Sequence, residues 1–132
     1  MRAYMKVNTF VLIIILFISC KSNLFYFDDK KQEIIAVDTY FGNIEINDLC
    51  NNESYVLNRT IGGEKKRKIN LNYIPESYQI INVKTSDTIQ IFTFKNECEY
   101  EVVNRGLYDA KERKIMLKMD SLGLFHVVGK SQ

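Results

Sequence analysis

The feature of this chain that most constrains its fold is the alternation of apolar and polar side chains in several short segments. Ile69, Leu71 and Tyr73 alternate with polar residues, and the same period of two recurs at 98–102 and 113–119. A period of two turns one face to a core and the other to solvent, which is typical of a half-buried β-strand. Since no segment has a comparably clear helical period, the sequence predicts an all-β protein.

Further strands are predicted where β-branched and aromatic residues lie between turn-forming residues. The segment 55–58 is expected at a sheet edge, and 78–84 and 87–95 are expected to form a hairpin. Within 87–95 the apolar parity shifts at Phe92, which predicts a bulge or a strand buried on both faces. Seven to nine short strands at this spacing predict an antiparallel β-sandwich, prealbumin-like or immunoglobulin-like, with a small barrel as the alternative. The expected strands are 33–41, 44–46, 55–58, 68–73, 78–84, 87–95, 98–102, 113–119 and 124–128.

The first nineteen residues have the composition of a secretory signal. Arg2 and Lys6 precede nine consecutive apolar residues, Phe10 to Ile18. Nine residues are too few for a membrane-spanning helix, which needs about 20, so the run is interpreted as the hydrophobic core of a signal peptide. Removing residues 1–19 leaves 113 of the 132 residues, one domain's length, with 16 basic and 16 acidic side chains. That balance differs from the positive field on which nucleic-acid binding depends, so no nucleic-acid partner is expected.

The segment Phe17, Ile18, Ser19, Cys20 resembles the lipobox of bacterial lipoproteins. In that family the cysteine thiol receives a diacylglyceryl group and signal peptidase II cleaves just before it. Phe17 departs from the pattern, because the position usually holds Leu, Val or Ile. The resemblance implies a signal peptide at 1–19, a lipidated tether at 20–23 and a domain at 24–132, attached to a membrane of the cell envelope through Cys20. Lys21 stands where Asp would favour retention at the inner membrane, so the resemblance implies the outer membrane. The alternative is that Cys20 is an ordinary residue in a signal that is uncleaved or cleaved elsewhere.

Cys50 and Cys98 remain as an even pair once Cys20 is assigned to the lipid. An exported chain reaches an oxidising compartment, which favours a disulfide between them. The alternative is two buried free thiols. Zinc sites need clustered Cys and His ligands, whereas this chain has three Cys and one His, so no metal or cofactor is expected.

Few residues are candidates for a functional site. Glu97, Glu99 and Glu101 recur at every second position, so they are expected along one face of a strand as a candidate partner surface, with an ordinary solvated face as the alternative. The one histidine, His126, has neither a second histidine nor a nucleophile motif to work with. The sequence therefore predicts no catalytic residues.

A second resemblance covers about residues 76–129. Val83, Lys84 and the segment 87–92 are followed by 115–118, Asp120, Leu124 and 127–129. This pattern resembles the carboxypeptidase-like regulatory domain, a prealbumin-like β-sandwich of bacterial envelope proteins, although His126 stands where that family commonly has Glu. The resemblance implies a non-catalytic protein-binding module in an envelope assembly. Two alternatives stay open, namely an immunity or inhibitor lipoprotein against an exported toxin or hydrolase, and a lipocalin-like carrier of an apolar ligand.

Overall fold

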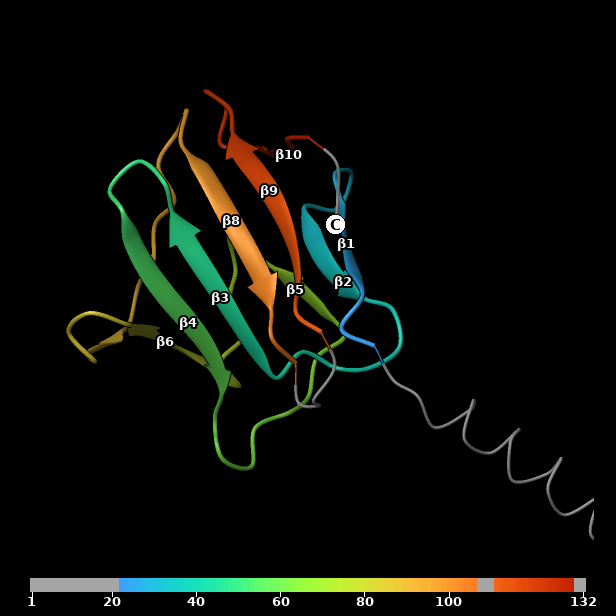
Figure 1. Ribbon diagram of the computed structural model, residues 1–132. Helices are drawn as coiled ribbons and strands as arrows, with labels where there is room; N and C mark the ends of the chain where they lie inside the picture. Colours follow the sequence, from blue (N-terminus) through green and yellow to red (C-terminus); the bar gives the residue numbers. More distant parts are fainter. Residues whose placement is uncertain (1–21, 107–110, 130–132) are drawn as a thin grey trace, which may run out of the picture.

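The computed structural model describes residues 22–106 and 111–129, so the expected signal peptide and Cys20 lie outside the described residues (Figure 1). Within those ranges the chain forms ten strands and no helix. The strands are β1 (Phe25–Asp28), β2 (Glu33–Ala36), β3 (Asn43–Asp48), β4 (Glu53–Arg59), β5 (Lys68–Asn70), β6 (Tyr78–Asn82), β7 (Thr88–Ile89), β8 (Glu99–Asn104), β9 (Arg113–Met119) and β10 (Phe125–Val127). Nine of these strands were expected from the sequence, and the additional one is β1, in the apolar segment after Asn23.

The strands form two antiparallel sheets, which confirms the predicted β-sandwich. Seven strands pair in the order β10-β9-β8-β3-β4-β6-β7, and three pair in the order β1-β2-β5. In Figure 1, β5 lies behind the larger sheet, and β1 and β2 lie beyond its β9 side. Apolar side chains of both sheets meet in one core, including Ile34 and Ile69 from the smaller sheet and Ile46, Leu57 and Leu117 from the larger one.

Aromatic side chains fill the space between the sheets. The Phe94 ring packs edge to face on Phe92, Tyr100 and Phe125, with centroids 4.6, 4.8 and 4.8 Å away. Phe92 and Phe94 reach this position because the chain leaves the sheet after Ile89, where β7 ends. The parity shift in 87–95 therefore marks neither a bulge nor a doubly buried strand, and that prediction was wrong. The predicted hairpin is confirmed as β6 and β7, although β7 is only two residues long.

Two other strand predictions need correction. The segment 55–58 was expected at an edge, whereas β4 pairs with β3 on one side and β6 on the other. The strand expected over 33–41 ends at Ala36, and Phe41 forms an isolated bridge with Lys66. In both cases long-range pairing, which local composition does not encode, decides the extent or position of the strand.

The predicted disulfide is present between Cys50 and Cys98, whose Cα atoms are 5.7 Å apart. Asp48 holds the turn that carries Cys50, since its Oδ1 accepts hydrogen bonds from the backbone N–H groups of Cys50 and Asn51, at 2.9 and 3.1 Å. Cys98 is buried just before β8. The bridge thus ties the β3–β4 turn to the start of β8.

Candidate functional site

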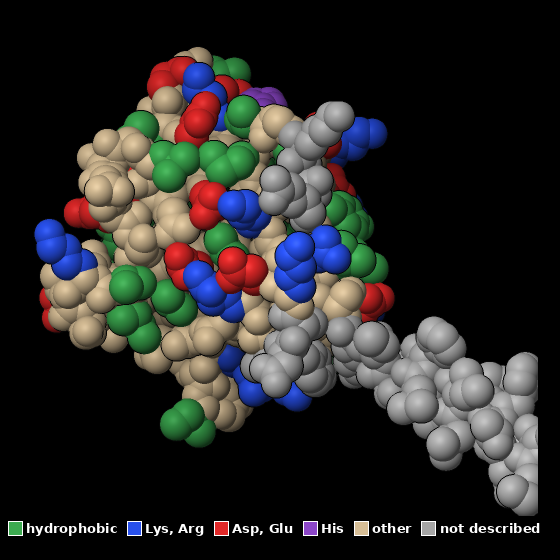
Figure 2. Space-filling model, viewed as in Figure 1, with side chains coloured by type: hydrophobic (Ala, Val, Ile, Leu, Met, Phe, Trp, Pro, Cys, Tyr) green, Lys and Arg blue, Asp and Glu red, His purple; other side chains and the backbone are tan. Residues whose placement is uncertain are grey.

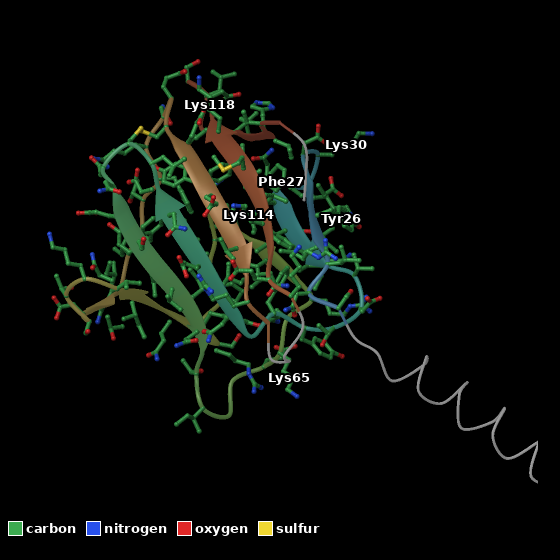
Figure 3. All side chains as sticks on the ribbon, viewed as in Figure 1. Tyr26, Phe27, Lys30, Lys65, Lys114 and Lys118 are labelled. Carbon is green, nitrogen blue, oxygen red and sulfur yellow. A yellow bond between two sulfur atoms is a disulfide. The ribbon has the colours of Figure 1, made fainter. Side chains whose placement is uncertain are left out.

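The predicted carboxylates lie opposite lysines of the neighbouring strand. Glu101 of β8 is 3.7 Å from Lys114 Nζ, and Glu97 is 3.8 Å from Lys118 Nζ. Glu99 is the register partner of Lys118, and Glu97 precedes the strand in a left-handed conformation, with φ of 63°. Figure 2 shows acidic and basic side chains side by side on this face, and Figure 3 labels both lysines. Two lysines of β9 thus offset most of the charge of the three carboxylates, so the surface is of mixed charge.

His126 and Asp120 stabilise the turn between β9 and β10. The His126 Nε2 atom lies 2.7 Å from Asp120 Oδ2. Asp120 Oδ1 accepts hydrogen bonds from the backbone N–H groups of Leu122 and Leu124, at 2.8 and 3.0 Å. The bond from Leu124, and next that from His126, hold the pKa of Asp120 below its usual value, because both favour the carboxylate. Within the described part of the chain, no group of three or more His, Cys, Asp or Glu side chains is placed to hold a metal ion.

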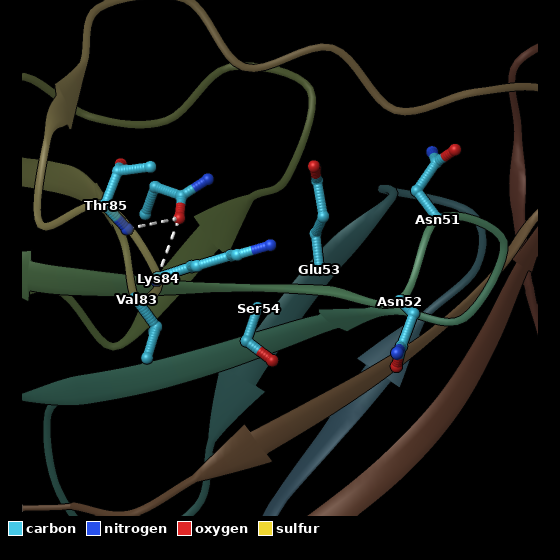
Figure 4. A pocket seen from close by; sticks show the side chains of 8 residues that line it. Asn51, Asn52, Glu53, Ser54, Val83, Lys84 and Thr85 are labelled. Carbon is cyan, nitrogen blue, oxygen red and sulfur yellow. Dashed lines mark hydrogen bonds between the residues drawn. The ribbon is translucent and has the colours of Figure 1, made fainter.

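A polar recess of about 550 Å³ lies between the β3–β4 turn and the β6–β7 turn (Figure 4). Asn82 Oδ1 accepts hydrogen bonds from the backbone N–H groups of Lys84 and Thr85, at 2.9 and 3.2 Å. Glu53 accepts a hydrogen bond from the Tyr55 hydroxyl, and this bond, followed by burial, raises the pKa of Tyr55 to about 12. Asn82 and Glu53, two of the residues that line the recess, thus make hydrogen bonds within the protein's own turn and strand.

An apolar groove follows the β7 side of the larger sheet. Two adjoining hollows of about 370 and 240 Å³ share Ile74, Ile80 and Gln90 in their walls. Tyr73 and Ile91 stand at its margin with 80% and 83% of their surface exposed. We call the surface formed by Tyr73, Ile74, Ile80, Gln90 and Ile91 the edge groove. Exposed apolar side chains gathered in this way mark interaction sites more often than isolated ones do.

The backbone beside the edge groove is open to a further strand. Among the described strands, β7 pairs with β6 alone, so it forms an edge of the sheet. The Asn82 N–H donates to Asp87 O at 2.9 Å, and Ile81 and Thr88 are the next register pair. Since hydrogen-bonded and non-hydrogen-bonded pairs alternate in an antiparallel ladder, the N–H and C=O groups of Thr88 point away from β6. They offer one donor and one acceptor to an added strand.

The opposite edge, β10, is closed by a side chain. Gln32 Oε1 accepts a hydrogen bond from Phe125 N at 2.7 Å, and Gln32 Nε2 donates to Phe125 O at 3.1 Å. The carboxamide thus makes the two bonds that a neighbouring strand would make. The Phe27 ring also packs edge to face against Phe125, with centroids 6.3 Å apart. Covering an edge in this way prevents pairing with other chains, so β7 is the more accessible of the two edges.

Sequence reasoning missed the edge groove. Tyr73 lies on the apolar face of the expected strand 68–73, and Ile91 lies within the expected strand 87–95, so apolar residues at both positions are expected in the core. The chain instead turns after Asn70, whose carbonyl accepts a hydrogen bond from Tyr73 N at 3.1 Å. The parity shift beyond Ile89 was the one signal that this region leaves the sheet.

The described ranges contain no helix that is long and apolar enough to cross a bilayer. No protein-family model, curated protein or solved structure matches the chain. Its function is therefore inferred from the geometry of the edge groove and from the sequence.

Proposed function

We propose that this chain is a lipid-anchored protein of the cell envelope, placed in the outer membrane, whose β-sandwich binds a partner protein without catalysis. The observation that carries the proposal is the open β7 edge beside the edge groove, in a domain whose other large-sheet edge is closed by Gln32. The partner supplies an extended segment that adds to the sheet as an eighth strand.

The anchor is supported by the sequence and by the disulfide. A signal-like run ends at Cys20, and the bridge between Cys50 and Cys98 suits an oxidising compartment. Lipid chains contribute about 0.8 kcal/mol for each buried methylene, so two or more chains on Cys20 would hold the protein on a membrane permanently.

Recognition at β7 would combine backbone and side-chain contacts. Thr88 supplies the hydrogen bonds of strand addition, and alternate side chains of the added segment enter the edge groove. Burying the exposed side chains of Tyr73 and Ile91 contributes roughly 1.5–3 kcal/mol each. The partner segment should therefore alternate apolar and polar residues.

An immunity or inhibitor lipoprotein would use the same edge, and the identity of the bound protein separates it from an assembly module. A carrier of an apolar ligand would need an interior cavity, as closed barrels provide. In the described residues, Phe94, Tyr100 and Phe125 pack together between the sheets. This packing favours protein recognition over the carrier alternative.

Site-specific photo-crosslinking in intact envelopes tests the proposal. A photoreactive residue at Ile91 should crosslink one defined protein, through an extended segment of that protein. The same residue at Ile61, a fully exposed isoleucine in the β4–β5 connection, is the matched control. The double substitution Tyr73→Asp and Ile91→Asp should abolish the crosslink to a probe at Gln90. Identical products from both positions, or a product that survives the double substitution, would contradict binding at this edge.

The variant Thr88→Pro tests strand addition itself. Proline removes the outward N–H of Thr88 and leaves the bonds between β6 and β7 in place, since proline is tolerated on an edge when its nitrogen faces solvent. Thr88→Ala is the control, because it keeps the amide. We expect the proline variant to lose the partner and the alanine variant to retain it, with both unfolding within about 1 kcal/mol of the wild type. Equal partner binding by both variants would refute strand addition.

A further inference from the structure

The start of the described chain lies among basic side chains. Leu24 O accepts a hydrogen bond from Val37 N at 3.0 Å, and Val37 O accepts one from Arg67 Nη2 at 2.8 Å. Arg67 belongs to the basic run 65–68, in which four consecutive residues are Lys or Arg. The fold therefore places this run beside the segment that leads to Cys20.

Asn23 fixes the position of that segment. Its side chain is buried, and its Nδ2 donates to Arg105 O and Lys111 O at 3.2 and 3.4 Å. Asn104 Nδ2 donates to Asn23 O at 3.0 Å. Although Asn23 was expected in a tether, it is part of the folded domain. Cys20 lies three positions before Asn23 in the sequence, and three residue steps can span at most about 10 Å.

The charge around this point is one-sided. We use the name tether end for the surface formed by residues 64–68, 105 and 111–113. It also includes the carboxylates that contact these residues or residue 22. It holds seven basic and four acidic residues, a formal net charge of +3, whereas the other described residues hold seven basic and eleven acidic ones, a net charge of −4. The basic residues are Lys65, Lys66, Arg67, Lys68, Arg105, Lys111 and Arg113, and the acidic ones are Asp38, Glu45, Glu64 and Glu112.

Some basic side chains of the tether end are exposed to solvent, and others are engaged in ion pairs. Lys65 and Lys111 are exposed on two separate segments, and their ammonium groups are available to phosphates. Arg105 is engaged by Glu45 and Glu112, at 2.7 and 2.6 Å. In Figure 3, Lys65 lies near the end where the described chain begins, while Lys30 and Lys118 lie toward the other end of the molecule.

We propose that the tether end lies against the membrane and that Lys65, Arg67 and Lys111 contact the phosphates of anionic lipid headgroups. This inference rests on lipid attachment at Cys20, because the short chain between a lipidated Cys20 and Asn23 would hold this end within reach of the headgroups. A cation beside an anionic membrane surface contributes about 1 kcal/mol, and the attraction fades within a Debye length of about 8–10 Å. That range matches the reach of the tether.

The orientation has a consequence for the edge groove. In the larger sheet, β7 lies at the opposite end of the strand order from β9 and β10. Figure 1 shows β6, the neighbour of β7, on the far side of the sheet from β1, where the chain enters the fold. Lys66 N donates to the hydroxyl of Tyr78, which lines one hollow of the groove, at 3.1 Å, so this end of the groove lies beside the tether end. The β7 edge itself lies across the sheet from β1, which leaves it accessible to a partner when the tether end is on the bilayer.

Hydrogen exchange on vesicles tests the orientation. The full chain, purified with its lipid, is reconstituted in phosphatidylcholine vesicles with and without phosphatidylglycerol. We expect the backbone amides of 64–68 and 111–113 to exchange roughly fivefold more slowly on the anionic vesicles, the effect of one cation beside the surface. Added salt should remove the difference. The double substitution Lys65→Glu and Lys111→Glu should abolish it, whereas Lys30→Glu with Lys31→Glu, the same charge change elsewhere, should not.

Flotation of the same samples separates the two proposals. If the chain floats with both kinds of vesicle and 64–68 exchanges equally on both, the orientation is wrong and the anchor stands. Protection that does not depend on phosphatidylglycerol or salt would also overturn lipid recognition. If the chain does not float with phosphatidylcholine vesicles, the anchor is wrong and the orientation fails with it.

Discussion

Replacing Gln32 by alanine should both destabilise the domain and open its second edge. Gln32 connects the β1–β2 turn to β10, through bonds of 2.7 and 3.1 Å to the backbone of Phe125. A third bond, from Gln32 Nε2 to Asp29 O at 2.7 Å, is exposed. Alanine removes all three and leaves the N–H and C=O of Phe125 facing solvent without a partner strand.

The magnitude follows from the environment of each bond. The two partly buried bonds to Phe125 contribute about 1 kcal/mol each, and water replaces the exposed bond to Asp29, so the expected loss is about 2 kcal/mol. Gln32 has a φ of 56°, a left-handed conformation that costs alanine the same as glutamine. Glycine avoids that cost of about 1 kcal/mol. Gln32→Gly should therefore lose about 1 kcal/mol less than Gln32→Ala.

Urea unfolding of the two variants measures these differences, and sedimentation measures self-association through the exposed β10 edge. We expect the order wild type, Gln32→Gly, Gln32→Ala in the free energy of unfolding, with more dimer in both variants than in the wild type. An alanine variant within about 0.5 kcal/mol of the wild type would refute the reasoning, since that is the effect of an ordinary surface substitution. So would a glycine variant less stable than the alanine variant.

Three further outcomes are expected. Cys50→Ala with Cys98→Ala should lower the free energy of unfolding by about 4 kcal/mol on the chain-entropy relation, since the bridge spans a separation of 48 residues; a loss below 1 kcal/mol in urea unfolding would contradict it. Phe94→Ala should cost about 3–5 kcal/mol, because its ring packs on three other aromatic rings; calorimetry showing an unchanged melting temperature would be inconsistent with that packing. Tyr55 should titrate near pH 12, not 10. Because the folded state holds this proton more tightly, the associated stability is present below pH 10 and is lost between pH 10 and about 12. Absorbance titration should place the pKa of Tyr55 nearer 10 in Glu53→Gln, and an unshifted pKa would show that Glu53 is not its main cause.

The two edges of the larger sheet differ in a way that would let the proposed partner bind without pairing between copies of this chain. A long exposed edge invites uncontrolled strand pairing. Here β10 is closed at Phe125 by a side chain, and β7 is only two residues long. The binding that we propose at β7 would then depend on the side chains of the edge groove and not on the backbone alone.

The alternation of side chains was enough to predict the all-β class and the position of several strands. β8 and β9 lie where the period of two is clearest, and the buried residues of β9 are the apolar members of that pattern. In β8 the pattern accounts for Tyr100 and Val102, whereas Val103 and Asn104 are buried as well. The even cysteine pair likewise predicted the disulfide between Cys50 and Cys98. These features could be predicted because each depends on residues a few positions apart, or on a simple count.

Tertiary structure alone decided which strands are edges and which polar side chains close them. Gln32 meets Phe125 across 93 positions of sequence, and Asn23 meets Lys111 across 88. Tyr73 and Ile91 are large apolar side chains of the kind that usually lie in a core. They are exposed because the chain turns before Tyr73 and leaves the sheet before Ile91. Side-chain periodicity reports which face of a strand is apolar, but the neighbours of that strand depend on long-range pairing. For that reason the edge groove and the basic tether end became visible only in the folded chain.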